Sequence, residues 1–391
     1  MRNAFSERDG ELIRVRVTGG VLTSQQLEAV AGCASAAGAT AEITSRANLQ
    51  LRGISQGDLG SVTGALEDAG LADSGRGEVL FGPMAGFDPS ELADVGPAGR
   101  QAAARIAAEA PAGLRPKFCA LLDGGGRFNL RGRRYDVSLG AVRTTDGNVR
   151  FELRVGEPLP TGPASDGQVV TTDTGGLVSI VMAGAVISAL EKAPLSEVVN
   201  RRGQAETIAE IVSRSGATVE MIDESRLLRP AGGSSAPIGS LRHGDGDLVA
   251  IGAMPLLGRL EPATLRRVAE IAEGNGCNEV RLTPWRSLLL PNVPASATED
   301  VTGDLVAGGL SCDPDDPAIG VVACAGSAGC PAGNADTQAD GQALIAALRL
   351  NPPRERLRIH LSGCAKRCAS QGGDDLTLIA EPPGLVTASR S

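Results

Sequence analysis

Aromatic residues and histidines are scarce in this chain. Phe, Trp and Tyr together make up 2% of the 391 residues, and there are only two histidines. The core must therefore be filled by Val, Leu, Ile and Ala, and a metal site built from three histidines is excluded. The 52 glycines predict many tight turns and leave little room for long helices.

A net positive charge and long hydrophobic runs are also lacking. The net charge of −9 disfavours nucleic acid and anionic membranes as partners. The N-terminal segment MRNAFSERDGE lacks the apolar core of a signal peptide. The longest apolar stretch, 177–190, is shorter than the roughly 20 residues of a membrane helix. We therefore expect a cytoplasmic protein that binds neither nucleic acid nor a membrane.

The length predicts about two to four structural units, and an internal repeat relates two of them. Residues 12–51 and 248–290 share one pattern: an alternating apolar strand, an amphipathic helix, a closing glycine and a second strand. A shift of 238 residues, with one gap near the end, gives these pairs: Leu27 with Leu265, Val30 with Val268, Ala31 with Ala269, Gly38 with Gly276, Glu42 with Glu279, and Ile43 with Val280.

The two copies are expected to pack together as one pseudo-symmetric domain, because a β-α-β unit of this size buries one face poorly alone. The alternative is that the two segments are not a true repeat and share only the general pattern of any strand–helix–strand unit. Segment 229–247, which has five glycines and no apolar period, is the best candidate for a linker. Further elements are predicted as helices over 88–110 and 196–215 and strands over 117–122, 135–142 and 149–155.

The eight cysteines are too sparse for a disulfide scaffold in a chain of this length. Four of them form two pairs, Cys324 with Cys330 in CAGSAGC and Cys364 with Cys368 in CAKRC. Structural zinc usually has about two to four residues between paired cysteines, and a redox dithiol has about two. Spacings of five and three, from separate loops, favour a larger object such as an iron–sulfur cluster. Zinc and unligated thiols remain as alternatives.

The cysteine spacing, the repeat before it and the segment TSRANLQLRGI at 44–54 together resemble the ferredoxin-like sulfite and nitrite reductases. The resemblance spans nearly the whole chain. It implies an α+β fold of two pseudo-repeated ferredoxin-like half-domains plus two nitrite/sulfite-reductase-type α/β domains, the C-terminal one carrying a [4Fe-4S] cluster. The implied units are half-domain 1 over 1–75, the first α/β domain over 76–232, half-domain 2 over 240–310 and the cluster domain over 311–391.

The resemblance also implies roles for single residues. The four paired cysteines would hold the cluster, and in siroheme-containing members the position of Cys368 also bridges to the siroheme iron. Arg46 would face the active site, and Gln50 would support it. The second copy of the repeat has Pro284 where the first has Arg46, so one half is expected to carry chemistry and the other structure.

Reduction of sulfite or nitrite requires several cations around a small anion. The reductases supply two lysines in an Arg-Lys-Phe-Lys strand and a second arginine. This chain reads RPKFC at 115–119, so Lys117 matches the first lysine and Cys119 stands in place of the second. The reductases' second arginine has its nearest counterpart in Arg76 of this chain, which is out of register with the family pattern. With about half of that cage missing, the chain is more similar to the precorrin-3B synthase branch of the family, which hydroxylates the tetrapyrrole precorrin-3A with O2 and forms a lactone in cobalamin biosynthesis.

That resemblance implies a precorrin-3A-like tetrapyrrole where reductases keep siroheme. The sequence does not decide whether the protein also binds siroheme or a mononuclear non-haem iron. No Gly-x-Gly-x-x-Gly follows a predicted strand, so electrons are expected from a separate donor, a ferredoxin or an NADH-linked reductase. The catalytic candidates are Arg46 and Lys117.

Arginines bind carboxylates well, and segment 115–134 holds six cationic residues and one acidic residue. The candidates for binding the tetrapyrrole are Gln50, Arg115, Arg131, Arg133 and Arg134. The alternative for this segment is a hairpin with solvated arginines. His243 is expected in the linker and His360 as a hydrogen-bonded histidine at a strand end. Two other functions are considered: a siroheme-dependent sulfite or nitrite reductase, and a non-enzymatic tetrapyrrole- or zinc-binding protein.

Overall fold

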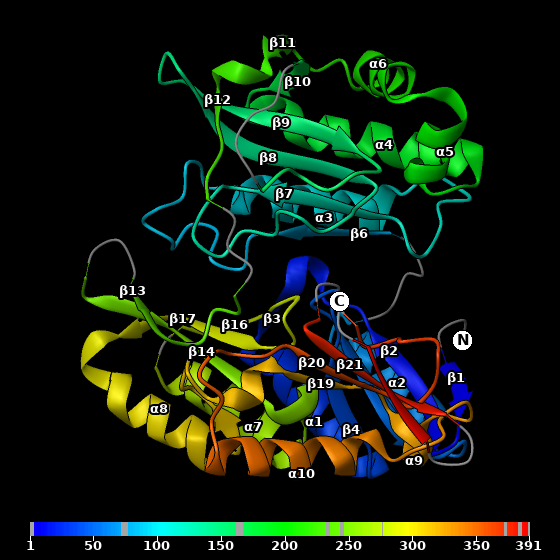
Figure 1. Cartoon of the computed structure of the whole chain (residues 1–391), viewed down its shortest axis with the longest axis vertical. Coiled ribbons are helices and arrows are strands. Elements are labelled where there is room, and N and C mark those ends of the chain that lie inside the picture. Colours follow the sequence, from blue (N-terminus) through cyan, green and yellow to red (C-terminus); the bar gives the residue numbers. More distant parts are fainter. Residues whose placement is uncertain are drawn as a thin grey trace.

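The computed structural model describes residues 4–71, 77–161, 167–231, 235–242, 246–275, 277–370, 374–381 and 385–389. Arg76, His243 and Gly276 lie outside the described residues. The described chain forms four β-sheets with helices packed against them. In Figure 1 the middle of the sequence forms an upper lobe, and both repeat copies form a lower lobe together with the C-terminal segment.

The first repeat copy forms an antiparallel five-stranded sheet in the order β1-β2-β5-β4-β15. Its strands and helices are β1 (Ala4–Glu7), β2 (Gly10–Val15), β4 (Thr40–Ile43), β5 (Leu49–Ile54), α1 (Ser24–Ala37) and α2 (Leu59–Asp68), with β15 (Arg259–Leu260) added from the second copy. Helix α1 begins with a capping box between Thr23 and Gln26 and ends at Gly38, whose φ of 61° lies in the left-handed region.

The second copy forms a sheet in the order β13-β14-β17-β16-β3, with β18 paired to β14. Its elements are β13 (Gly239–Arg242), β14 (Leu248–Pro255), α7 (Pro262–Gly274), β16 (Glu279–Leu282), β17 (Leu288–Pro294), α8 (Thr298–Ala307) and β18 (Leu310–Ser311), with β3 (Val21–Thr23) added from the first copy. The copies thus exchange one strand each, and α1 packs against α7 in a shared apolar core. The predicted pseudo-symmetric pair of half-domains is confirmed.

The hairpin turns of the two copies correct the alignment made from sequence. The Thr44 N–H donates to the Asn48 carbonyl at 2.9 Å, and the Thr283 N–H donates to the Ser287 carbonyl at 2.9 Å. Position 44 therefore corresponds to 283, which places Trp285 at the position of Arg46. The pairing of Arg46 with Pro284 is wrong by one residue, and the pairings of Glu42 with Glu279 and Ile43 with Val280 are wrong as well. The connection from α7 to β16 is longer than that from α1 to β4, so the gap runs in the opposite direction.

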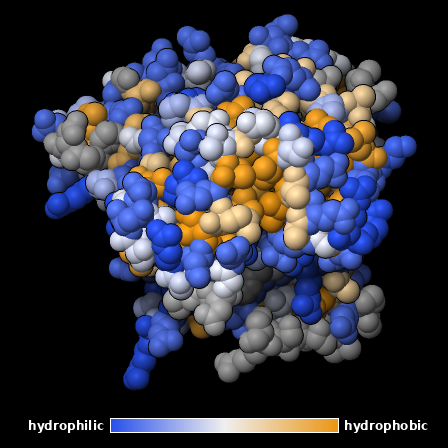
Figure 2. All heavy atoms as spheres, turned by 90° about the horizontal axis from the view of Figure 1, so that it is seen from above, coloured by the Kyte–Doolittle hydropathy of each residue, from blue (hydrophilic) through white to orange (hydrophobic). Residues whose placement is uncertain are grey.

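The central domain is one sheet in the order β11-β10-β9-β8-β7-β6, with β12 paired to β8 and with β6, β7 and β8 parallel. Its elements are β6 (Glu78–Phe81), α3 (Gly96–Glu109), β7 (Cys119–Asp123), β8 (Val137–Thr144), β9 (Val149–Val155), β10 (Gln168–Thr172), α4 (Leu177–Glu191), α5 (Leu195–Arg202), α6 (Gln204–Ser215), β11 (Val219–Asp223) and β12 (Leu227–Leu228). Figure 2 looks down on this end of the molecule and shows apolar atoms gathered in the middle of a largely hydrophilic face.

Helix α4 is the most apolar element. Counted with the turn before it, from Thr174 to Glu191, the helix is long and apolar enough to cross a membrane. The sequence-based argument that this segment is too short for a membrane span is therefore wrong. Of this segment 56% is buried, and α4 packs against α3, α5, α6 and β8. That is the environment of a core helix.

Three element predictions need correction. The helix predicted over 88–110 begins only at Gly96, because Asp88 and Asp94 accept main-chain N–H groups and stabilise turns before it. The helix predicted over 196–215 is two helices, α5 and α6, broken at Gly203, where φ is 94°. The predicted linker 229–247 contains strand β13.

The C-terminal domain has a four-stranded sheet in the order β19-β20-β21-β22, whose first three strands are parallel. Its elements are β19 (Val321–Ala323), α9 (Gly326–Gly329), α10 (Thr337–Leu350), β20 (Ile359–Ser362), β21 (Leu376–Glu381) and β22 (Leu385–Ser389). Helix α10 connects β19 to β20 as α3 connects β6 to β7, so this domain repeats the arrangement of the central sheet.

Candidate functional site

The two cysteine pairs follow neighbouring parallel strands. Cys324 comes directly after β19, and Cys364 lies two residues after the end of β20. Because carboxyl ends of parallel strands meet at one edge of a sheet, the two loops converge. The Gly363 N–H donates to the Cys324 sulfur at 3.1 Å, which joins the loops directly.

The thiols have the chemistry and setting expected of cluster ligands. Cys324, Cys330 and Cys364 are half-buried and Cys368 is exposed. The pKa of the Cys368 thiol is raised, first by burial and then by the neighbouring Cys364, Cys324 and Cys330, which places all four within electrostatic reach of one another. Within the described ranges, no three His, Cys, Asp or Glu side chains close around a single metal ion.

Small residues keep the two loops close together. A Cβ added at Gly363 would lie 3.2 Å from Gly326 Cα and 3.5 Å from the Cys324 sulfur, and one at Gly326 would lie 2.6 Å from the Thr337 nitrogen. Main-chain N–H groups can therefore approach the sulfurs, as cluster sites require. The donor set and its packing fit a [4Fe-4S] cluster.

The cluster loops are held to the sheet of the first half-domain. The buried Arg52 donates to the Gly329 carbonyl at 2.7 Å and pairs with Asp9 at 3.1 Å. Arg8 donates to the Ser327 carbonyl at 2.9 Å. These contacts fix the Cys324–Cys330 loop against strands that also lead to Arg46.

Arg46 and Lys117, predicted as catalytic cations, are brought together from different domains. The Arg46 guanidinium donates to the Lys117 carbonyl at 3.3 Å and lies 3.6 Å from Glu78. Glu78 also holds Arg16 at 3.1 Å. Arg46 is 39% exposed and Lys117 is exposed, so both side chains remain accessible.

Cys119, two residues beyond Lys117, is buried and uncharged. Burial raises the pKa of its thiol strongly, and nearby Glu78 adds to the shift. Of the supporting residues, Gln50 donates to Glu42, which also binds Arg259 at 3.0 Å. Arg115 is half-buried, and its Nε has no hydrogen-bond partner among the described residues.

The predicted arginine group is not gathered in one place. Arg131 is buried, donates to the Ala141 carbonyl at 2.7 Å and lies 3.9 Å from Glu152, inside the central domain. Arg133 lies over the Trp285 ring at 5.0 Å and donates to the Pro284 carbonyl at 3.3 Å. Arg134 is exposed. Their roles in binding a tetrapyrrole stay predictions, and the geometry favours Arg133 over Arg131.

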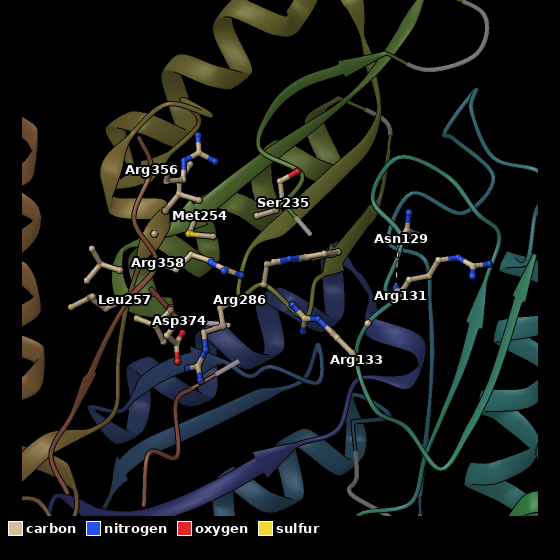
Figure 3. Close-up of a pocket in the computed structure, with 18 of the residues that line it drawn as sticks. Asn129, Arg131, Arg133, Ser235, Met254, Leu257, Arg286, Arg356, Arg358 and Asp374 are labelled. Atoms are coloured by element: carbon tan, nitrogen blue, oxygen red, sulfur yellow. Dashed lines mark hydrogen bonds between the residues drawn. The ribbon is translucent and has the colours of Figure 1, made fainter. Parts of the chain in front are cut away.

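A cavity of about 560 Å³ lies where the central loop 129–133, the second half-domain and the C-terminal domain meet. Its cationic lining comes from Arg131, Arg133, Arg286, Arg356 and Arg358, and Asp374 is the carboxylate among them. In Figure 3, Arg133 and Arg358 reach toward the middle from opposite sides, whereas Arg131 extends away. Four of these lining residues were not predicted from the sequence: Trp285, Arg286, Arg356 and Arg358. A repeat alignment in which position 44 corresponds to 283 points to Trp285 and Arg286.

His360 was predicted to be a hydrogen-bonded histidine at a strand end, and the structure differs in its hydrogen bonding. The side chain is fully buried, and neither ring nitrogen has a hydrogen bond within the described part of the chain. Its Nδ1 lies 3.8 Å from Asp374. Burial lowers the pKa of the imidazole, Asp374 opposes that shift, and Arg286 adds to it.

Comparisons with known proteins agree with this architecture. The model of the nitrite/sulfite reductase ferredoxin-like half domain matches residues 6–69 and 241–308. A precorrin-3B synthase from a Sinorhizobium species is 32% identical over 383 residues, covering 96% of this chain and 78% of that protein. Sulfite reductase (ferredoxin) 2 of Mycolicibacterium paratuberculosis is 26% identical, covering 92% and 67%. The Mycobacterium tuberculosis NirA structure matches with a TM-score of 0.76 at 22% identity over 97% of this chain and 73% of that one, a likeness of fold.

Proposed function

The chain belongs to the nitrite/sulfite reductase family with ferredoxin-like half domains, and within it we propose a monooxygenase of the precorrin-3B synthase type. The reaction is the O2-dependent hydroxylation of precorrin-3A with lactone formation, a step of cobalamin biosynthesis. One oxygen atom enters the tetrapyrrole and the other leaves as water, which takes two electrons and two protons. A separate donor, a ferredoxin or an NADH-linked reductase, supplies the electrons.

The observation that carries this choice is the neutral, buried thiol of Cys119 beside Lys117. Lys117 lies in the turn before β7, and Cys119 is the first residue of that strand, where the reductases' Arg-Lys-Phe-Lys pattern has its second lysine. Burial keeps the thiol protonated, and it supplies no positive charge. The remaining pair, Arg46 and Lys117, suits binding and orienting a carboxylate-bearing substrate better than reducing sulfite or nitrite.

Cys324, Cys330, Cys364 and Cys368 are proposed to hold a [4Fe-4S] cluster, which when bound stores and passes single electrons. Arg52 and Arg8 keep the first cysteine loop in place through its carbonyls. Arg46, held by Glu78, and Lys117 are proposed to bind the substrate's carboxylates, with Gln50 and Arg115 as supporting residues. A cytoplasmic location without nucleic acid or membrane partners fits the acidic net charge and the buried α4.

The experiment supplies the reconstituted protein with precorrin-3A, a chemical or enzymatic electron donor and isotopically labelled O2. The expected product gains one labelled oxygen atom by mass spectrometry. Sulfite and nitrite should support negligible oxidation of reduced viologen in the same preparation. Brisk sulfite- or nitrite-dependent oxidation without tetrapyrrole product would assign the protein to the reductases instead.

A further inference from the structure

The cavity lined by Arg133, Trp285, Arg286, Arg356 and Arg358 occupies a defined place in the internal repeat. In the first copy, the turn carrying Arg46 faces the start of β6, at Glu78. In the second copy, the equivalent turn carrying Trp285 and Arg286 faces the start of β19, at Val321. The cavity is thus the counterpart of the Arg46 site on the other half of the molecule.

The two places differ in charge. A hollow of about 20 Å³ lies beside Arg46 in the described residues, and Glu78 pairs there with both Arg16 and Arg46. On the second side β19 begins with Val321 whereas β6 begins with Glu78, so the first residue of the strand is apolar instead of a carboxylate. The space there is about 560 Å³, within the usual range for small-molecule sites of roughly 300–1,000 Å³.

The cations come from separate elements. Arg133 belongs to the central loop, Arg286 to the hairpin turn of the second half-domain, and Arg356 and Arg358 to the segment before β20 (Figure 3). The buried Nε of Arg286 has no hydrogen-bond partner among the described atoms. A ligand with carboxylates spread around its edge suits cations that come from opposite sides of a cavity better than a small inorganic anion does.

The cavity also offers apolar surface. Trp285 is 8% exposed, and the Arg133 guanidinium lies over the face of its ring. Met254, Leu257 and Val321 add aliphatic lining. A flat ligand can lie along such surface with its charges directed at the arginines. We propose that this cavity is a second binding site, distinct from the Arg46–Lys117 site, for a flat organic polycarboxylate of tetrapyrrole size.

Binding without chemistry is expected here, because the loops of the central domain that correspond to the cysteine loops carry no thiol. Gly82 follows β6 where Cys324 follows β19, and Gly124–Gly126 follow β7. The site would hold a substrate or product molecule before or after reaction. The inference does not depend on the proposed reaction, since a reductase could equally hold a polycarboxylate there.

The test uses uroporphyrin III, a flat metal-free polycarboxylate, in equilibrium dialysis against the full-length protein with its cluster. The variant is Arg356→Gln/Arg358→Gln, whose side chains are 37% and 54% exposed, so folding should be retained. The variant should bind one equivalent fewer than wild type, or bind at that site at least about tenfold more weakly, which corresponds to about 1.4 kcal/mol. Arg354→Gln, an exposed arginine of the same segment outside the cavity lining, is the matched control.

Two further measurements complete the test. Arg46→Ala/Lys117→Ala should keep the equivalent that the cavity variant loses, which separates this inference from the proposed function. Trp285→Phe should lower the affinity with which this same equivalent of porphyrin is bound. An unchanged stoichiometry and affinity in the cavity variant would overturn the proposal. So would displacement of the porphyrin by inorganic phosphate as readily as by a second organic polycarboxylate.

Discussion

The guanidinium of Arg46 donates a hydrogen bond of 3.3 Å to the main-chain carbonyl of Lys117. The first residue belongs to the hairpin of a half-domain and the second to the segment that enters β7 of the central domain. The bond therefore joins the Arg46 guanidinium to the main chain at Lys117 and couples this site to the packing of the two domains. Glu78, which binds both Arg16 and Arg46, orients the guanidinium.

Replacing either cation should reduce turnover and leave the cofactor intact. Removal of one donor aimed at developing charge typically costs about 10²–10³-fold in rate, and we expect losses of that order for Arg46→Ala and Lys117→Ala. The visible spectrum should not change, because neither residue contacts the cysteine loops in the described structure. Arg105→Ala, an exposed helix arginine paired with Glu109, is the control. Near-normal product formation in both variants would make these residues ordinary turn positions.

Serine substitution of any one of the four paired cysteines should bleach the iron–sulfur chromophore, since an alcohol is a poor ligand for soft iron–sulfur sites. The matched control is Cys312→Ser, because Cys312 is a buried singleton whose thiol pKa is raised by burial to about 11. Iron and acid-labile sulfide analysis reports the result. Full content of both in Cys330→Ser would refute the ligand assignment.

Glu152 should be essential for the stability of the central domain. Its side chain is fully buried and binds Arg229 at 2.9 Å and Arg154 at 2.8 Å, with Arg131 3.9 Å away. Glu152→Gln would leave Glu224 as the carboxylate that still pairs with Arg154 and Arg229. Breaking a buried pair typically costs about 3–5 kcal/mol in the free energy of unfolding. Urea denaturation measures it.

The control for Glu152→Gln is Glu109→Gln, which removes an exposed helix pair with Arg105. Such pairs contribute about 0.3–0.5 kcal/mol. Equal urea midpoints for Glu152→Gln and Glu109→Gln would show that the negative charge of Glu152 does not stabilise the central domain.

The sequence was most informative where local patterns decide structure. A helix in the first repeat copy was predicted from its apolar period and closing glycine, and the structure has it over Ser24–Ala37. The spacing of the paired cysteines predicted that they lie in two separate loops. The site on the second half was missed because Trp285 and Arg286 become recognisable only once the turn at 283–287 is superposed on that at 44–48. A one-residue error in that alignment hid both residues.

Long-range ion pairs set a second limit on sequence reasoning. Arg131 lies in a run of arginines that suggests a ligand cradle, yet its guanidinium binds interior carbonyls and approaches Glu152, 21 positions away in sequence. Strand pairing between β8 and β9 decides this, and local composition does not record it.

Stability should depend on pH through Glu91. Burial raises the pKa of this carboxyl to about 8, and Asp94, Asp88 and Asp123 add to the shift, opposed by a hydrogen bond from the Gly86 N–H. The folded state therefore holds a proton that the unfolded chain has lost, so this contribution is fully present below the unfolded pKa of 4.5 and is lost as pH rises through about 8. Glu91→Gln should flatten the fall in unfolding free energy over that window, and Glu109→Gln should not. Parallel pH profiles for wild type and Glu91→Gln would contradict the assignment.

The most direct test of the account is the anaerobic visible spectrum of the purified protein, recorded together with iron and sulfide analysis. A four-cysteine cluster without siroheme predicts a broad brown shoulder and about four iron and four sulfide per chain, with no strong porphyrin-type bands. Strong siroheme bands, accompanied by sulfite-dependent oxidation of reduced viologen, would contradict the monooxygenase proposal. A colourless protein containing one zinc per chain would contradict the cluster itself.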